Sequence, residues 1–225
     1  MNECFKRIIL DIKDIRKESI ENVFYFPNED NILEGDILII GPENTPYQYG
    51  NYIFKLIFTK KYPYEPPIVK YLSNDGNTRF NPNFYRNGKV CLSILNTWPG
   101  EKWSACQSLR SLLVTLQITL NDNPLLNEPG ISEETHPIMI QNYNKIIEYK
   151  NIEFTILYYI KNPDCIPCQN EELKEIIHKK YNENKDKIMD IININVKKYK
   201  KEICSITLYN MTNYVIHYKK ILKYV

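Results

Sequence analysis

Hydrophobic residues near the start of the chain recur with the period of an α-helix. They form one stripe, made of Phe5, Ile8, Ile9, Ile12 and Ile15. Basic side chains such as Lys6 and Arg7 lie off this stripe. The spacing predicts an amphipathic helix over residues 3–18.

Strand-like segments follow the predicted helix. Runs rich in Ile, Phe and Tyr occupy residues 23–26, 32–40 and 52–59, and Pro, Asn, Asp and Gly separate them. Such runs between turn residues are typical of β-strands, so they predict an antiparallel meander. The prolines within residues 62–67 exclude a central strand there, and a short apolar run follows at 68–72.

Helical periodicity returns in the second half of the chain. A leucine stripe consists of Leu109, Leu112, Leu113, Leu116 and Leu120. Further helical patterns cover about residues 133–148 and 151–160, and the last 58 residues contain no Pro, so a helix can run there, opened by Asn170 as its cap. One helix, then strands, then only helices predicts an α+β domain with a helical C-terminal extension.

Composition excludes several classes of protein. The 225 residues are 43% hydrophobic and 25% charged, which is typical of a globular chain. No apolar stretch is long enough to span a membrane, and the charged N-terminus lacks the apolar region of a signal peptide. We therefore expect an intracellular protein, cytoplasmic or nuclear, without a membrane partner. The seven Gly are too widely spaced for a dinucleotide fingerprint or a P-loop, and no HExxH metal motif is present.

Charge is unevenly distributed along the chain. The net charge is only +2, but residues 165–225 hold 12 Lys and Arg against 7 Asp and Glu. The predicted extension is therefore basic. The run of Lys around Tyr199 is expected to be a solvated helix face, with nuclear targeting or nucleic-acid contact as the alternatives. No RNA-binding strand motif is present, so a nucleic-acid partner is not predicted.

The long segment 74–103 shows little periodicity and many turn residues, and long loops inside a compact domain are often functional. Cys91 follows an Asn87-Gly88 turn there, among apolar neighbours. From this context Cys91 either packs as a small hydrophobe or serves as a nucleophile. The nearest His in sequence is His136, so a cysteine hydrolase has no local signature.

Asn81-Pro82-Asn83 precedes Cys91 by eight to ten positions. This segment resembles the active site of the ubiquitin-conjugating enzymes, where His-Pro-Asn precedes the acceptor Cys at the same spacing. The resemblance extends over about residues 3–160. Other matching pieces, in order, are Lys6-Arg7, Gly41-Pro42, Thr45-Pro46-Tyr47, Gly50, Tyr62 to Val69, Trp103-Ser104 and Asn123-Pro124.

Two departures narrow the resemblance to one subfamily. Asn81 stands where most of the family has His, and the segment from Asn96 to Lys102 is longer than in the minimal enzymes. Both features are similar to the Z-type ubiquitin-conjugating enzymes, which carry a helical C-terminal extension. The other matches to this type are Asn127 to Gly130, His136-Pro137 and Asn142 to Asn144. The resemblance implies a conjugating core, with a four-stranded meander, over residues 1–162 and a basic helical extension over 163–225.

The resemblance implies an activity that needs no cofactor and no metal. Cys91 would accept ubiquitin or a ubiquitin-like modifier from an activating enzyme as a thioester. It would then transfer the modifier to a lysine of a protein substrate, alone or with a ubiquitin ligase. The rival hypothesis is an inactive adaptor of the same fold, in which Cys91 is vestigial and the extension binds a partner.

Roles for other residues of the site follow from the resemblance. Asn83 matches the residue proposed to stabilise the oxyanion, although an Asn in this position also orders the loop by binding backbone. Glu128, or alternatively Asn127, would hold and deprotonate the incoming lysine, unless it is only a solvated loop residue. Asn81 and Pro82 would support the loop.

Partner surfaces are implied in the same way. Lys6 and Arg7 match residues that dock the activating enzyme, although a solvated helix face is the alternative. Tyr64 stands where the family has an apolar ring that meets the ligase. Ala105 replaces the Pro that is usual in the second ligase-facing loop, and Trp103 is expected to anchor the core.

The pair Cys165 and Cys168 has the spacing of a metal half-site or a redox motif. No second pair of ligands with matching spacing occurs, and no βαβ context surrounds the pair. We therefore expect packing or a turn here, and no metal site.

Overall fold

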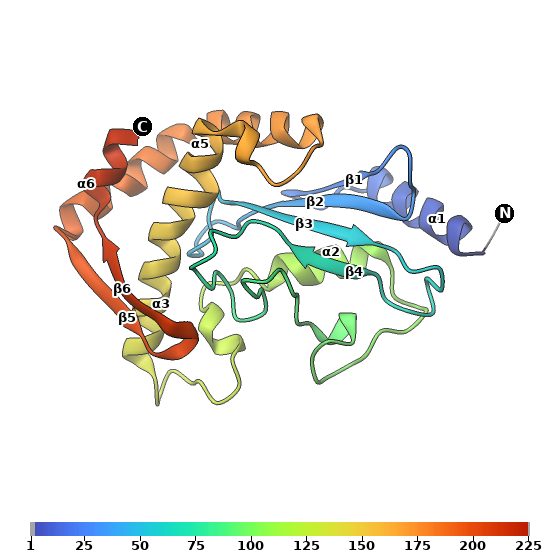
Figure 1. Ribbon diagram of the computed structural model, residues 1–225, viewed down its shortest axis with the longest axis horizontal. Coiled ribbons are helices and arrows are strands. Elements are labelled where there is room, and N and C mark those ends of the chain that lie inside the picture. The colour runs from blue at the N-terminus through green and yellow to red at the C-terminus, as the bar shows by residue number, and fades with distance from the viewer. Residues whose placement is uncertain (1–2, 225) are drawn as a thin grey trace.

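The computed structural model describes residues 3–224 and contains a four-stranded sheet, a separate hairpin and helices around them (Figure 1). The first elements are α1 (Glu3–Lys17), β1 (Val23–Pro27), β2 (Glu34–Ile40), β3 (Asn51–Ile57) and β4 (Ile68–Tyr71). The later ones are α2 (Leu109–Ile118), α3 (Pro137–Lys150), α4 (Tyr159–Lys161), α5 (Glu171–Lys198), β5 (Glu202–Ile206), β6 (Met211–Ile216) and α6 (Tyr218–Ile221). The predicted α+β class is confirmed.

The four strands form an antiparallel meander in the order β1-β2-β3-β4, as the sequence predicted. Ile39 in β2 pairs with Val23 on one side and with Tyr52 on the other. Each observed strand begins and ends within two residues of the predicted run. Runs of large apolar residues, separated by turn residues, were therefore sufficient to locate this sheet.

Helices cover both faces of the sheet. In β2, Ile37 and Ile39 join the main hydrophobic cluster, which includes the leucines of α2 and, from α1, Ile8 and Ile12. Their neighbours Leu38 and Ile40 point to the opposite face, where they pack with residues of α5 such as Leu173 and Ile177. Because successive side chains of a strand face opposite sides, the extension buries the face that α2 leaves open.

The segment after α3 continues as a π-helix over Asn151–Tyr158 and attaches to the start of β3. The side chain of Asn51 donates to the Thr155 carbonyl oxygen across 2.7 Å, and the Tyr52 hydroxyl donates to Asn151 Oδ1 across 2.7 Å. Gly50 permits this approach, since a Cβ there would lie 1.8 Å from Asn151 Oδ1. The matched Gly50 thus has a packing role.

The C-terminal extension is helical only in part. Helix α5 begins after Asn170, whose side chain accepts a hydrogen bond from the Leu173 amide, as the predicted cap requires. Beyond Lys198, however, the chain forms the β5-β6 hairpin and then short α6. The prediction of a wholly helical extension over residues 163–225 is therefore wrong for this hairpin.

After α5 the spacing of buried residues changes from that of a helix to that of a strand. The absence of Pro is compatible with both, so it did not indicate the change. In β5, Cys204 and Ile206 are buried, whereas Ile203 before them is 64% exposed and Ser205 between them is exposed, which is the two-residue alternation of a strand. Cys204 and Ile206 join the main cluster beside α3. The hairpin therefore lies along α3 (Figure 1).

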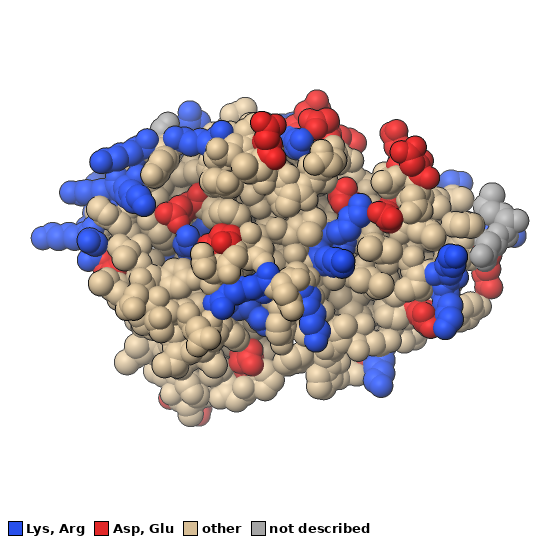
Figure 2. Space-filling model, viewed as in Figure 1, with Lys and Arg blue, Asp and Glu red and all other residues tan. Residues whose placement is uncertain are grey.

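Basic side chains concentrate on the extension. Figure 2 shows Lys and Arg gathered at the end of the molecule where Figure 1 places α6 and the end of α5. The exposed residues there are Lys197, Lys198, Lys200, Lys201, Lys219, Lys220 and Lys223. Among residues 3–224, no helix is long and apolar enough to cross a membrane.

Candidate active site

The loop that carries Cys91 is a small hairpin outside the main sheet. Phe84 bridges to Val90, and Lys89 bridges back to Lys70 of β4. The chain reverses at Asn87-Gly88, where Gly88 has φ +85°, a conformation that favours Gly. The predicted turn is therefore present. Cys91 directly follows Val90, on the second arm of this small hairpin.

Cys91 and Asn83 face each other across this small hairpin through two hydrogen bonds. The Cys91 amide donates to the Asn83 carbonyl oxygen across 2.9 Å. The Asn83 side-chain Nδ2 donates to the Cys91 carbonyl oxygen across 2.7 Å. The Cys91 residue is only 2% exposed, so its position is fixed by backbone contacts and burial.

The Asn83 side chain retains further hydrogen-bonding capacity. An amide nitrogen carries two hydrogens, and the bond to Cys91 uses one of them. Its Oδ1 is buried and has no hydrogen-bond partner among the described residues. The two roles considered for Asn83 are therefore compatible, since one N–H orders the loop and the other is available to a developing oxyanion.

Asn81, which replaces the usual His, is fully buried and braces the loop from three directions. Its Oδ1 accepts from the Asn83 amide across 2.9 Å. Its Nδ2 donates to the Tyr47 hydroxyl and to the Thr119 carbonyl oxygen, each across 2.9 Å. The Thr119 carbonyl lies at the C-terminus of α2, where helical acceptors lack intrahelical partners. Asn81 thus ties the site to α2.

Tyr47 reaches the site because of the turn that follows β2. The Gly41 amide donates to the Gly50 carbonyl oxygen across 2.8 Å, and a Cβ on Gly41 would lie 1.7 Å from the Tyr47 carbonyl oxygen. The Tyr47 hydroxyl donates to the Phe80 carbonyl oxygen across 2.8 Å. Burial raises the pKa of Tyr47, so this phenol remains a donor.

Arg79 supports the same loop and was missed by the sequence analysis. It is 8% exposed, and it donates from Nε to the Asn81 carbonyl oxygen and from Nη2 to the Pro82 carbonyl oxygen, across 3.1 and 2.6 Å. The guanidinium carbon lies 3.3 Å from the centroid of the Tyr85 ring. The available signal in the sequence was that Arg79 stands two residues before the matched Asn81. A buried charged side chain needs polar partners, and the nearby carbonyl oxygens of this loop supply them.

The predicted lysine-facing residues lie beyond α2, at the end of the 3₁₀ turn Pro124–Asn127. Asn127 Oδ1 accepts from Asn121 Nδ2 across 3.3 Å. The Glu128 carboxylate instead accepts a hydrogen bond from Tyr209, across 2.5 Å to Oε2. Within residues 3–224, neither residue hydrogen-bonds to Cys91.

His136 does not form a catalytic pair with Cys91. It stands immediately before α3, and its Nδ1 lies 2.6 Å from the Thr135 hydroxyl oxygen. No hydrogen bond joins His136 to Cys91 in the described part of the chain. The geometry gives the cysteine hydrolase hypothesis no support.

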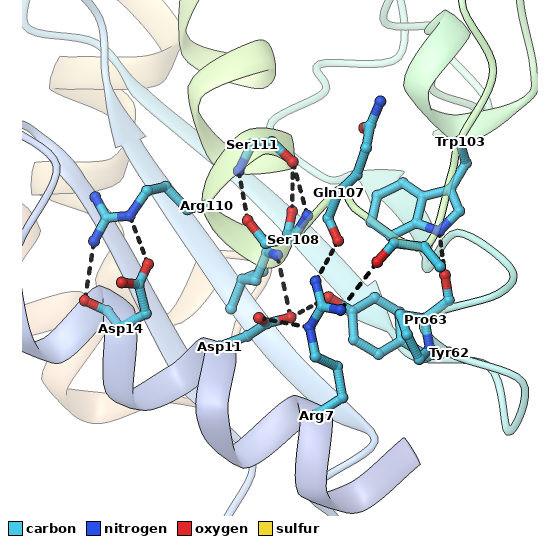
Figure 3. A network of polar contacts seen from close by, with 12 residues as sticks. Arg7, Asp11, Asp14, Tyr62, Pro63, Trp103, Gln107, Ser108, Arg110 and Ser111 are labelled. Atoms are coloured by element: carbon cyan, nitrogen blue, oxygen red, sulfur yellow. Dashed lines mark hydrogen bonds and ion pairs between the residues drawn. The ribbon is translucent and has the colours of Figure 1, made fainter. Parts of the chain in front are cut away.

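The two predicted docking residues on α1 differ in their surroundings. Lys6 is exposed, whereas Arg7 pairs with the buried carboxylate of Asp11, 3.0 Å from Nε to Oδ1. Arg7 also donates to the carbonyl oxygens of Ala105 and Gln107, across 3.0 and 2.5 Å (Figure 3). Arg7 therefore links α1 to the loop before α2. Of the two basic side chains, Lys6 is the more accessible to a partner protein.

The predicted ligase-facing residues lie beside this network. Tyr64 is 65% exposed, and its hydroxyl donates to Glu3 Oε1 across 2.9 Å. Trp103 is buried, and its Nε1 donates to the Pro63 carbonyl oxygen across 2.6 Å (Figure 3). Trp103 is thus a core anchor, as predicted, and its hydrogen bond joins the loop before α2 to the loop that contains Pro63. The carbonyl oxygen of Ala105 accepts a hydrogen bond from Arg7.

Cys165 and Cys168 do not form a disulfide, and only Cys165 is exposed. Cys168 packs in the cluster between α5 and the sheet, and Cys165 ends the 3₁₀ turn Pro163–Cys165, so the expectation of packing or a turn is confirmed. Across residues 3–224, no group of three His, Cys, Asp or Glu side chains is placed to hold a metal ion.

Comparison with known proteins places these residues in a family. The family model described as ubiquitin-conjugating enzyme matches residues 7–150. Ubiquitin-conjugating enzyme E2 Z of Homo sapiens is 40% identical over 185 residues, which cover 82% of this chain and 51% of that protein. The chain thus spans about half the length of the E2 Z relatives that it matches.

Two further matches are more distant. The dual E2 ubiquitin-conjugating enzyme/E3 ubiquitin-protein ligase BIRC6 of Homo sapiens is 38% identical over 173 residues, which cover 72% of this chain and 3% of that protein. The solved structure of human ubiquitin-conjugating enzyme E2 G1 is 26% identical, covers 53% of this chain and 96% of its own, and has a TM-score of 0.47.

Proposed function

Because the chain belongs to the ubiquitin-conjugating enzyme family, we propose that it carries ubiquitin or a ubiquitin-like modifier as a thioester on Cys91. The observation that carries this proposal is the pair of hydrogen bonds that holds Cys91 against Asn83, inside the part of the chain that matches the family. The resemblance to Z-type enzymes is confirmed by the 40% identity over 82% of the chain.

The proposed reaction has two acyl transfers. First, the Cys91 thiolate attacks the thioester between the modifier and an activating enzyme, and the thiol of that enzyme leaves. Second, a lysine amine attacks the Cys91 thioester, the Cys91 thiol leaves and an amide forms. The first step exchanges one thioester for another, so it requires positioning rather than a strong base, which fits a site without a His partner.

The second step develops an oxyanion, and Asn83 is the proposed donor to it. Its second N–H is uncommitted, and removing one such donor from an active site costs about 3 to 4 kcal/mol of barrier. We assign to Glu128 the task of holding and deprotonating the incoming lysine, since a carboxylate accepts from an amine. Asn81 and Pro82 support the loop through the contacts with Tyr47, Thr119 and Arg79.

The proposed partners are the modifier, an activating enzyme, a ubiquitin ligase and protein substrates that offer lysines. Lys6, which is exposed on α1, is assigned to the activating enzyme, and Arg7 contributes by shaping this surface. Exposed Tyr64 is assigned to the ligase, because exposed aromatic rings favour interfaces. We also propose the division into a conjugating core, residues 1–162, and an extension, 163–225.

A loading assay tests the proposed function. The protein is mixed with an activating enzyme, ATP and the modifier, and the products are separated with and without a thiol reductant. We expect an adduct that the reductant removes and that Cys91→Ala does not form, whereas Cys106→Ala, which changes an exposed thiol, retains it. If no adduct forms with any modifier and activating enzyme tested, the carrier function is refuted. The inactive adaptor is then the remaining hypothesis.

A further inference from the structure

The tip of the β5-β6 hairpin lies against the loops of the candidate active site. Tyr209 and Asn210 form this tip with positive φ angles of 58° and 54°. The Arg86 guanidinium, from the loop that carries Cys91, donates from Nη2 to the Tyr209 carbonyl oxygen across 2.5 Å. Residues more than a hundred positions apart are thereby joined, and the tip is fixed through its backbone.

The side chain of Tyr209 contacts two further parts of the site. Its hydroxyl donates to Glu128 Oε2 across 2.5 Å. The centroid of its ring lies 5.0 Å from the guanidinium carbon of Arg79, at a distance typical of a cation–π contact. The ring also packs edge-on against the buried ring of Tyr143, with centroids 6.4 Å apart.

A continuous set of contacts therefore runs from the extension to Cys91. Glu128 contacts Tyr209, and Tyr209 contacts Arg79. Arg79 in turn binds the carbonyl oxygens of Asn81 and Pro82, the two residues before Asn83. Tyr209 thus lies between the residue assigned to the lysine and the loop that holds the thioester.

The phenol of Tyr209 is suited to orient a carboxylate. Burial, followed by the hydrogen bond to Glu128, raises the pKa of Tyr209, so its hydroxyl keeps its proton and remains a donor. Within the described chain, Oε2 of Glu128 has this partner while Oε1 has none. One carboxylate oxygen is therefore held, and the other remains available to an amine.

We propose that Tyr209 is a positioning residue for lysine transfer, through which the C-terminal extension holds the Glu128 carboxylate at the acceptor side of the site. The inference rests on the proposed function. Among the described residues, no hydrogen bond or ring contact joins Tyr209 to Cys91 or to α1. Tyr209 therefore affects discharge of the thioester to lysine, and loading of Cys91 does not depend on it.

The experiment uses the full chain and Tyr209→Phe, which removes the hydroxyl and keeps the ring on Arg79. The protein is loaded with the modifier, the activating enzyme is quenched, and discharge to free lysine is followed over a range of lysine concentrations. We expect unchanged loading, and discharge at low lysine slowed about 10-fold, as loss of a hydrogen bond to a charged group allows. The lysine concentration for half-maximal rate should rise.

The matched control is Tyr214→Phe in the same hairpin. The Tyr214 hydroxyl donates to the Asn77 carbonyl oxygen across 3.0 Å and, among the described residues, makes no hydrogen bond to Glu128. A role of the hairpin in stability alone would make both variants behave alike, whereas the inference predicts an effect of Tyr209→Phe only. Melting temperatures of all variants are measured in parallel.

A double-mutant cycle tests whether Tyr209 acts through Glu128. In a Glu128→Gln background, the additional effect of Tyr209→Phe on discharge should disappear. An effect that persists there in full, or normal discharge by Tyr209→Phe, would overturn this inference while the loaded Cys91 thioester stands. A wild-type chain that never loads would overturn the proposed function and this inference together.

Discussion

The Asn83 side chain donates to the Cys91 carbonyl oxygen across 2.7 Å, and the Cys91 amide donates to the Asn83 carbonyl oxygen across 2.9 Å. These reciprocal bonds join the two residues most directly assigned to the chemistry. They place an amide donor beside the residue that would bear the thioester. Both bonds lie within the small hairpin that carries Cys91, so they hold this residue in position without a His side chain.

The first prediction concerns the second N–H of Asn83. In Asn83→Ala this donor is lost, and we expect single-turnover discharge to free lysine to fall by about 100-fold or more. Loading of Cys91 should remain, because the Cys91 amide still donates to the main-chain carbonyl oxygen of residue 83 and keeps Cys91 in position. Discharge at the wild-type rate by a folded variant would show that Asn83 only orders the loop.

The second prediction separates docking from folding on α1. Arg7→Ala removes the partner of a buried carboxylate, and we expect a stability loss of about 2 kcal/mol, between the values for exposed and buried ion pairs. Lys6→Ala, at an exposed neighbouring position, should leave the melting temperature unchanged and raise the concentration of protein needed for half-maximal loading. Equal stability losses in both variants would contradict this assignment.

The third prediction concerns the order in which the thiols react. Exposed Cys106 and Cys165 should be alkylated first, and buried Cys91 more slowly. Burial raises the pKa of Cys168 to about 11, so below that pH its folded-state thiol stays protonated, and thiolate is the reactive form. Cys168 should therefore resist alkylation at pH 8 and begin to react as the pH approaches 11.

Peptide mapping by mass spectrometry after timed alkylation measures this order. Denaturant provides the control, because an unfolded Cys titrates near its ordinary pKa of about 8.5. All six thiols should then react together. Fast alkylation of Cys168 in the folded protein at pH 8 would mean that α5 does not bury it against the sheet.

The fourth prediction tests whether α5 stabilises the sheet. Ile177 is fully buried between α5 and the strands, whereas Ile194 on the same helix is 61% exposed. Ile177→Ala should cost about 2 to 5 kcal/mol in the free energy of unfolding, and Ile194→Ala less than about 0.5 kcal/mol. Similar values for the two variants, measured by urea unfolding, would argue against this packing.

Much of the fold could be predicted from the sequence because its signals were local. The apolar run of β2, bounded by turn residues, and the period of 3.6 in α2 located those elements. The β5-β6 hairpin was missed because the absence of Pro permits a helix without requiring one. The spacing of Cys204 and Ile206 on either side of polar Ser205 was the available signal.

The candidate site was predictable only where a motif carried it. Cys91, Asn83 and Asn81 were found through the resemblance of their segment to the family motif, and the structure brings them together. Neither Tyr209 nor Arg79 belongs to that motif. Tyr209 meets Glu128 only through the tertiary fold, and the burial of Arg79 beside Asn81 and Pro82 is not visible in the sequence. A single sequence does not show that residue 209 meets residue 128, which is 81 positions away.

The central claim is that Cys91 carries the modifier, and replacing its sulfur by oxygen tests this most directly. Cys91→Ser is incubated with activating enzyme, ATP and modifier, and the intact mass is measured after treatment with a reductant. The wild-type adduct should disappear because a thioester is cleaved by thiols, while any serine adduct should persist as an oxygen ester. A reductant-sensitive adduct that still forms on Cys91→Ser would place the acceptor at another thiol and contradict the account.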